Sequence, residues 1–245
     1  MPSWTARALA ALVLLASARA AAGPPYDTDD PEPVELHHWE VYLATHQSLT
    51  RGDAAGTAPH VEVNYGAQPG LQLHLIVPLV YDRPSGGPTR VGVGDVELGV
   101  KIRFLTEGRW RPMVGTFPFL EVPAGEAVDG IRTGQPRLFL PLWLQKSAGR
   151  LTTYGGAGYW INPGAGNRNW WFVGWQAQVK VAKWVAPGAE LYYQTADHAG
   201  GRGDLRFNVG LVADLGEHHH LLLSAGRSIV GDTRFQGYCA YQLTL

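Results

Sequence analysis

Apolar and polar side chains alternate with a period of two along most of this chain. In residues 94–105, for example, Val96 and Leu98 are interleaved with charged side chains. Successive side chains of a β-strand point to opposite faces, so this stretch has one apolar and one charged face. The same two-faced pattern recurs in residues 136–146 and 204–214. The hydrophobic pattern therefore predicts β-strands.

Turn-forming residues divide the chain after residue 35 into twelve such segments. Clusters of Gly, Pro, Asn and Asp separate runs that are rich in Val, Leu, Tyr, Trp and Thr, which is typical of strands joined by turns. No helical stretch competes with these runs, so we predict an all-β fold. The predicted strands span residues 36–47, 58–66, 70–82, 94–105, 111–122, 136–146, 150–161, 169–182, 184–195, 204–214, 219–228 and 235–245.

Strand length and aromatic placement favour a membrane barrel over a water-soluble barrel or sandwich, which would show the same alternation. Strands of roughly ten residues can cross a bilayer at a tilt, whereas soluble strands centre on about 5 to 6 residues. Aromatic side chains gather near strand ends, as an interfacial girdle requires. The residues expected in this girdle are Trp39, Tyr65, Tyr81, Trp160, Trp170, Trp171 and Trp184.

The connections between strands also follow a membrane-barrel pattern. Those after even-numbered strands are short, such as 67–69, whereas those after odd-numbered strands are mostly longer, such as 48–57 and 83–93. The last strand runs to an apolar residue at the end of the chain, Leu245. Residues 36–245 are therefore predicted to form a transmembrane antiparallel up-and-down β-barrel of about 12 strands in a bacterial outer membrane.

The N-terminus has the pattern of a secretory signal peptide. Arg7 precedes the apolar run 8–16, and Ala18-Arg19-Ala20 supplies the small residues that signal peptidase needs. The alternative, a short anchor helix, would be too short to span the hydrocarbon. We expect residues 1–22 to be the signal peptide and the Pro-rich, acidic residues 23–35 to be an extended periplasmic lead-in.

Composition limits the partners of the chain. Lys and Arg number 20 and Asp and Glu 21, so there is no basic excess of the kind that binds nucleic acid. Cys239 is the single cysteine, which excludes an internal disulfide and a Cys-based zinc site. We predict no cofactor and no nucleic-acid partner, and outer-membrane lipid as the surrounding medium.

Several long motifs carry a family resemblance. They are PPYDTDDPEPVELHHWE (24–40), APHVEVNYG (58–66), GVGDVELGVKIRF (92–104), FLPLWLQKS (139–147), YGGAGYWINPG (154–164) and EHHHLLLSAGR (217–227). With these motifs the mature chain resembles a family of proteobacterial outer-membrane barrels described as transporters and as the MetA-type component of phenol degradation. The resemblance implies a porin-like channel or transporter for small hydrophobic or aromatic solutes, and it offers no catalytic residues.

Strand parity identifies the side chains expected to line the lumen. Both signs of charge occur among them, so they would form either a selective polar passage or an internal salt-bridge plug, because isolated charges in a narrow bore are costly. The predicted lumen residues are Glu62, Asn64, Gln72, His74, Asp95, Glu97, Lys101, Arg103, Arg137, Gln176, Lys180, Glu190, Gln194, Arg206 and Asn208.

Two groups of residues suggest other chemistry. The histidines 37–38 and 218–220 could supply metal ligands, but adjacent residues of a strand point to opposite faces, so we predict no metal site. Asp197, His198 and Ser228 could form a hydrolase site, but there is no nucleophile-elbow motif. We therefore predict that the protein is not an enzyme. A soluble periplasmic barrel that binds an apolar ligand is the third class, and it would extract without detergent.

Overall fold

The computed structural model describes residues 24–124 and 134–245 and is built from β-strands. No helix in these residues is long and apolar enough to cross a membrane. The predicted signal peptide, residues 1–22, lies outside the described residues. The strands are β1 Trp39–Leu49, β2 Ala54–Gln68, β3 Leu71–Arg83, β4 Arg90–Val93, β5 Val96–Leu105, β6 Met113–Thr116, β7 Phe119–Val122, β8 Arg137–Ala148, β9 Leu151–Ile161, β10 Trp170–Val179, β11 Val185–Gln194, β12 Asp204–Asp214, β13 His219–Val230 and β14 Phe235–Thr244.

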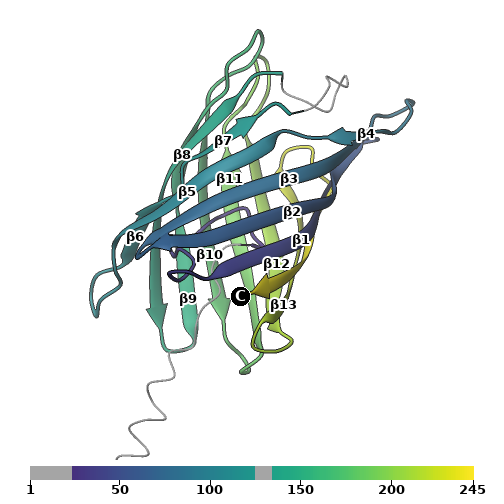
Figure 1. Cartoon of the computed structure of the whole chain (residues 1–245). Coiled ribbons are helices and arrows are strands. Elements are labelled where there is room, and N and C mark those ends of the chain that lie inside the picture. Colours follow the sequence, from purple (N-terminus) through teal and green to yellow (C-terminus); the bar gives the residue numbers. More distant parts are fainter. Residues whose placement is uncertain (1–23, 125–133) are drawn as a thin grey trace, which may run out of the picture.

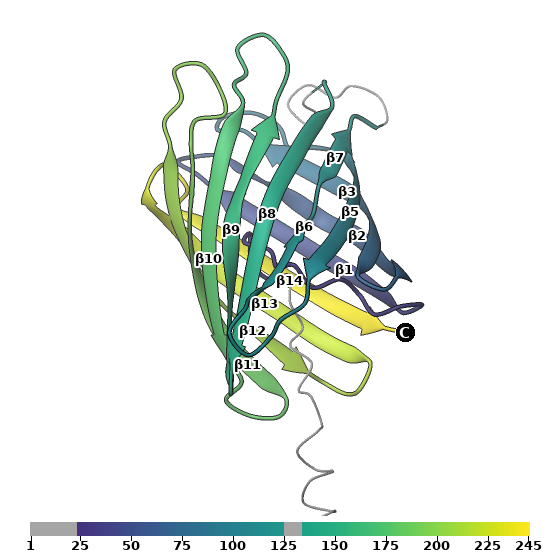
Figure 2. The same ribbon diagram turned by 90° about the vertical axis from the view of Figure 1, so that its left-hand side faces the viewer.

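The sheet closes on itself, because β1 pairs with both β2 and β14 (Figures 1 and 2). Two positions in the barrel are each occupied by a pair of short strands. β4 and β5 pair with successive parts of β3, and β6 and β7 lie end to end between β5 and β8. The fourteen strands therefore form an antiparallel barrel with twelve positions, which confirms the predicted fold class.

Most strands begin and end within a few residues of the predicted bounds, and the largest difference is in β2. This strand begins at Ala54, so the predicted long connection 48–57 shrinks to the residues between Leu49 and Ala54. Small residues in this stretch resemble a loop, but Leu49 pairs with Ala54 and the ladder continues from there. A bulge between Thr57 and His60 absorbs Pro59, which has no N–H to donate.

The outer face of the barrel is apolar. Leu142, in the middle of β8, is 49% exposed, and its register partner on β9 is Ala157. A continuous apolar surface of this kind suits hydrocarbon and is rare on water-soluble monomers. Other exposed members are Leu43, Val61, Leu73, Leu75, Val77, Leu98, Leu140, Val173, Leu191 and Val209.

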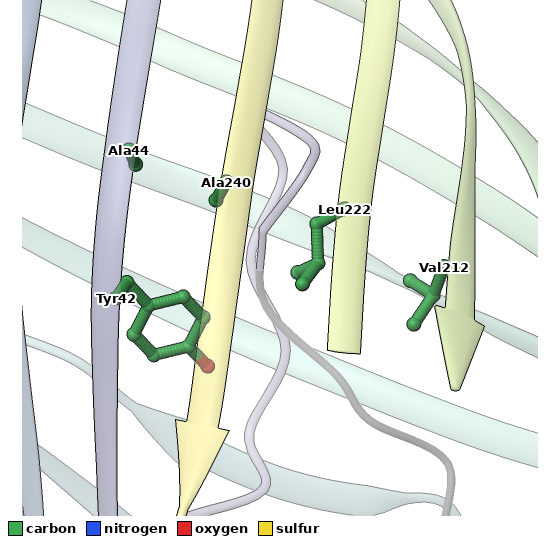
Figure 3. Packing of buried hydrophobic residues seen from close by; sticks show 5 residues of the cluster. All are labelled: Tyr42, Ala44, Val212, Leu222 and Ala240. Carbon is green, nitrogen blue, oxygen red and sulfur yellow. The ribbon is translucent and has the colours of Figure 1, made fainter. Parts of the chain in front are cut away.

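Small apolar side chains cover part of the inner face. Ala44, Ala240, Leu222 and Val212 are register partners on β1, β14, β13 and β12, and Tyr42 lies beside them (Figure 3). Two of these four residues are alanines, so this part of the wall projects little into the barrel. The wall leaves room for backbone that lies inside the lumen.

The two walls of the barrel differ in orientation and in content. Strands β1, β2, β3 and β5 run at a shallow angle, whereas β8 to β12 stand steeply behind them (Figure 1). The inward face of the first wall is mostly polar and charged, and the inward face of the second carries most of the buried aromatic rings. The lumen therefore has two chemically different sides.

Candidate functional site in the barrel lumen

A cavity of about 920 Å³ lies inside the barrel. Its lining includes Glu217 and Thr244, next to the short connections at one end, and Glu121 and Gln194, next to the longer connections at the other. The cavity therefore extends along the length of the barrel.

Most of the predicted lumen residues line this cavity, although their role in transport stays a prediction. Each lies on the inward-facing parity of its strand or at a strand end. These residues are Glu62, Asn64, Gln72, His74, Asp95, Glu97, Lys101, Lys180, Gln194, Arg206 and Asn208.

The other four predicted residues take different positions. Gln176 and Glu190 are almost completely buried. Arg137 forms an ion pair with Glu121. Arg103 borders a smaller groove together with residues of the N-terminal segment. Gln176 and Glu190 belong to the packed interior, Arg137 is partly exposed, and Arg103 lies at the edge of the barrel interior.

A hydrogen-bonded network holds the polar wall together. His74 contacts Glu97 through Nε2 at 2.8 Å and the Asn64 oxygen through Nδ1 at 2.6 Å. Asn64 in turn donates to Glu62 at 2.7 Å, and His74 Nδ1 lies 3.7 Å from the same carboxylate. These groups come from β2, β3 and β5, so the polar side chains of three adjacent strands act as one unit.

An aromatic row crosses the opposite wall. Phe119, Phe139, Trp160 and Trp170 are successive register partners on β7, β8, β9 and β10. Their ring centroids are 5.2, 4.8 and 4.9 Å apart in that order, which is the spacing of favourable ring pairs. We call these four residues the aromatic row. All four line the cavity.

Gly158 makes room for the aromatic row. A Cβ atom built on Gly158 would lie 2.2 Å from two ring atoms of Phe139, so the ring occupies the space that any other side chain would need. The glycines of β9 give its sequence no clear hydrophobic face, and for that reason its parity could not be predicted. In the structure, Gly158 leaves the space that the Phe139 ring occupies, and the rings of Phe139, Trp160 and Trp170 stack side by side.

The predicted aromatic girdle needs a correction at two positions. Trp160 and Trp170 do not face the membrane interface, because both line the lumen. Trp39, Trp171 and Trp184 do lie on the outside, with 42%, 53% and 60% of their surface exposed. Adjacent residues of a strand point to opposite faces, so only one of Trp170 and Trp171 can reach the interface. Both residues lie near the same strand end, so their position along the strand does not predict which of the two side chains faces outward.

We expect that Gly158→Ala displaces the Phe139 ring and disturbs the aromatic row. The ring must leave its place or the backbone must shift, and overpacking of this kind costs about 1 to 3 kcal/mol. The near-UV circular dichroism of the stacked rings should weaken, and the urea midpoint in lipid should fall. Ala157→Val, on the outer face of the same strand, is the matched control. An unchanged aromatic spectrum in Gly158→Ala would contradict the proposed role of the glycine.

Residues 24–38, here called the N-terminal segment, lie partly inside the barrel. We predicted an extended periplasmic lead-in over residues 23–35, whereas the described part of this range contacts the inner wall. The backbone N–H groups of Asp27 and Thr28 donate to the two carboxylate oxygens of Glu190 at 2.9 and 2.8 Å. The N–H of Val34 donates to the Gln72 side chain at 2.9 Å. Inward-facing side chains thus accept hydrogen bonds from backbone N–H groups of the N-terminal segment.

Charged side chains of the N-terminal segment are also anchored. Lys101 lies 3.0 Å from Asp29 and 3.6 Å from Asp30, and Asp30 is completely buried. Burial raises the pKa of Asp30 well above its usual range, against the opposing attraction of Lys101. Asn208 and Gln236 both donate to Asp27 at 2.9 Å. These contacts reach several strands, so the segment narrows the lumen.

The histidines form separate pairs. His220 contacts Asp214 at 2.8 Å, His219 contacts the Tyr241 hydroxyl, and His38 contacts its own turn at the Leu36 carbonyl. Within residues 24–124 and 134–245, no group of three or more His, Cys, Asp or Glu side chains is placed to hold a metal ion.

The three candidate hydrolase residues have different partners. His198 contacts Asp197 at 2.7 Å, as a catalytic pair would. The Ser228 hydroxyl, however, donates to Asp204 at 2.7 Å and accepts the Thr233 N–H at 3.2 Å. The candidate nucleophile Ser228 therefore donates its hydroxyl hydrogen to Asp204, and His198 pairs with Asp197.

Comparison with known proteins identifies relatives in fold. No family model and no curated protein sequence matches the chain. Among solved structures, the COG4313 outer membrane channel from Pseudomonas putida F1 aligns with a TM-score of 0.71 and 15% identity, over 90% of this chain and 100% of that one. The chain has the fold of an outer-membrane barrel.

Two further structures support the same fold. The NanC porin aligns with a TM-score of 0.55 and 7% identity, over 83% of this chain and 98% of that one. The translocator domain of the autotransporter NalP from Neisseria meningitidis aligns with a TM-score of 0.52 and 9% identity, over 98% and 94%. At these identities the likeness concerns architecture, so function has to be argued from the lumen.

Proposed function

We propose that this protein is an outer-membrane channel for small hydrophobic or aromatic solutes. The observation that carries the proposal is a cavity that extends along a closed barrel, whose outer face is apolar and whose inner face has an aromatic wall. Cavities that bind organic solutes are mostly apolar, with a few polar groups that fix orientation. The sequence motifs that resemble the phenol-degradation family agree with an aromatic solute.

The N-terminal segment supports a second candidate, a plugged barrel without transport. Its contacts with Glu190, Gln72 and Lys101 place backbone in the lumen. Single-channel recording of the mature protein in planar bilayers separates the two functions. A channel gives discrete current steps, and an aromatic solute should interrupt them. Bilayers that contain folded protein but show no steps would support the plugged barrel.

The mature chain should begin at Ala21 or Gly23 and fractionate with the outer membrane. A closed β-ladder has no free edge for detergent to attack, so the unboiled protein should migrate differently from the boiled protein in a denaturing gel. Mass spectrometry of the extracted protein measures the cleavage site. Recovery from the soluble periplasm without detergent would contradict the membrane location.

A further inference from the structure

We propose that the aromatic row and the carboxylates of Asp95, Glu97 and Glu121 form a binding site for aromatic solutes that carry a positive charge, such as arylalkylammonium ions. This inference rests on the proposed function and narrows its solute class. It selects against aromatic carboxylates of the same size. These seven residues line one end of the cavity.

Strand pairing brings the three carboxylates to the aromatic row. Glu121 follows Phe119 by two residues on β7, so both side chains lie on the same face. The register partner of Glu121 on β5 is Glu97, and Asp95 precedes Glu97 by two residues. All three carboxylates line the cavity next to the longer connections. A solute whose ring packs against the aromatic row would therefore place its substituent beside them.

The aromatic row already accepts one cation from the protein. The guanidinium of Arg137 lies 5.5 Å from the centre of the Trp160 ring and forms an ion pair with Glu121. A cation within about 6 Å of an aromatic ring is attracted by the negative face of the ring. This arrangement of ring, cation and carboxylate is the one that the proposed solute would repeat on the neighbouring rings.

The carboxylates keep contact with the cavity. The side chains of Glu97 and Glu121 are each 18% exposed, whereas His74, which pairs with Glu97, is 3% exposed. Arg137 pairs with Glu121 and His74 pairs with Glu97, and both carboxylates still reach the cavity, where a cationic solute would meet them.

The charge of the whole cavity acts in the same direction. Among the residues that the structure describes, eleven Asp and Glu side chains line the cavity, against three Lys and Arg. The complete chain has a formal net charge of only −1, so the acidic residues are concentrated in the lumen. Five histidines line the cavity as well, and acidic side chains still outnumber Lys, Arg and His together. A low-dielectric wall with an excess of one sign of charge concentrates solutes of the opposite sign. The lumen thus repels an aromatic carboxylate before it reaches the aromatic row.

Three probes of similar size test the two halves of the site separately. 2-Phenylethylammonium has both the ring and the charge, 3-phenylpropionate has the ring and the opposite charge, and hexylammonium has the charge without the ring. Binding to the detergent-solubilised mature protein is measured by titration calorimetry, and block of single-channel current is measured in bilayers. We expect 2-phenylethylammonium to bind at least about tenfold more tightly than either of the others.

Variants locate the site. Trp170→Leu should weaken binding of 2-phenylethylammonium and leave hexylammonium unchanged, whereas Glu121→Gln should weaken both cations. Trp171→Leu removes the adjacent Trp from the outer face, where it is 53% exposed, and is the matched control for Trp170→Leu. Glu217→Gln removes a carboxylate from the opposite end of the cavity and is the control for Glu121→Gln.

The two measurements separate this inference from the proposed function. Equal affinity for 2-phenylethylammonium and 3-phenylpropionate in a conducting channel would overturn the inference and leave the channel intact. Selective binding of 2-phenylethylammonium without any conductance would support the site and contradict the channel. Equal loss of binding in Trp170→Leu and Trp171→Leu would show that the ring effect is not local, and would overturn the assignment to the aromatic row.

Discussion

Replacing Lys101 with Met should release the N-terminal segment from the lumen. Lys101 is 4% exposed and is the cation next to Asp29 and Asp30. Breaking a buried ion pair by removing one partner costs about 3 to 5 kcal/mol, because the remaining charge stays buried and uncompensated. Undocking of the segment relieves this cost, since the two carboxylates then reach water. The single-channel conductance should rise, because the segment no longer narrows the cavity.

Cysteine labelling measures this release directly. Thr28 is completely buried, so Thr28→Cys in a Cys239→Ser background should resist a water-soluble maleimide. Adding Lys101→Met should make the same cysteine reactive, whereas Lys101→Arg keeps the charge and should protect it. Lys146→Met is the control, because Lys146 pairs with Glu107 and is 37% exposed. Continued protection of the cysteine in Lys101→Met would show that the ion pairs do not hold the segment.

Replacing Leu142 with Arg should destabilise the barrel in a way that depends on depth in the membrane. Leu142 is in the middle of β8 and points outward, where it is 49% exposed. An Arg near the bilayer midplane costs about 2 to 4 kcal/mol, and the cost falls to about 0 to 1 kcal/mol near the interfaces. Leu151→Arg, at the first residue of β9, is therefore the matched control. Urea unfolding in lipid vesicles measures both variants.

A spin label distinguishes a lipid-facing position from a packed core. Leu142→Cys in the Cys239→Ser background gives a single attachment site. Oxygen concentrates in hydrocarbon, so it should relax this label far more than a water-soluble nickel complex does. Protection from both reagents in reconstituted bilayers would place Leu142 in a protein interior and would contradict the membrane barrel.

Local patterns predicted the strands well because barrel strands are regular and their side chains alternate. Residues 204–214 were predicted as one strand and form β12 with the same bounds. The prediction was weaker where side chains are small. Ala54 and Gly56 looked like a loop, and their strand character comes from pairing with β1. The inward-facing residues of β9 could not be predicted, because glycine has no side chain that would distinguish one face of the strand from the other.

The same alternation of side chains predicted part of the candidate site. Charged residues such as Glu97 and Lys101 indicate which face of their strand points inward, because a charge on the lipid face would be costly. Aromatic residues do not indicate which face of a strand they lie on, since a Trp is favourable both at a membrane interface and in a packed lumen. Trp160 and Trp170 could therefore be assigned to the wrong face, and the aromatic row was missed.

The architecture could be predicted from the sequence: the twelve positions of the barrel, the apolar outer face that includes Leu142, and the charged side chains that point inward. These follow from a period of two, which is a property of each strand alone. The positions of the N-terminal segment and of the aromatic rings depend on contacts between distant parts of the chain. Residues 24–38 have the composition of a free linker, and their place in the lumen depends on acceptors such as Glu190 and Gln72, far away in the sequence. The aromatic row depends on the register between β7, β8, β9 and β10, which exists only when the barrel has closed.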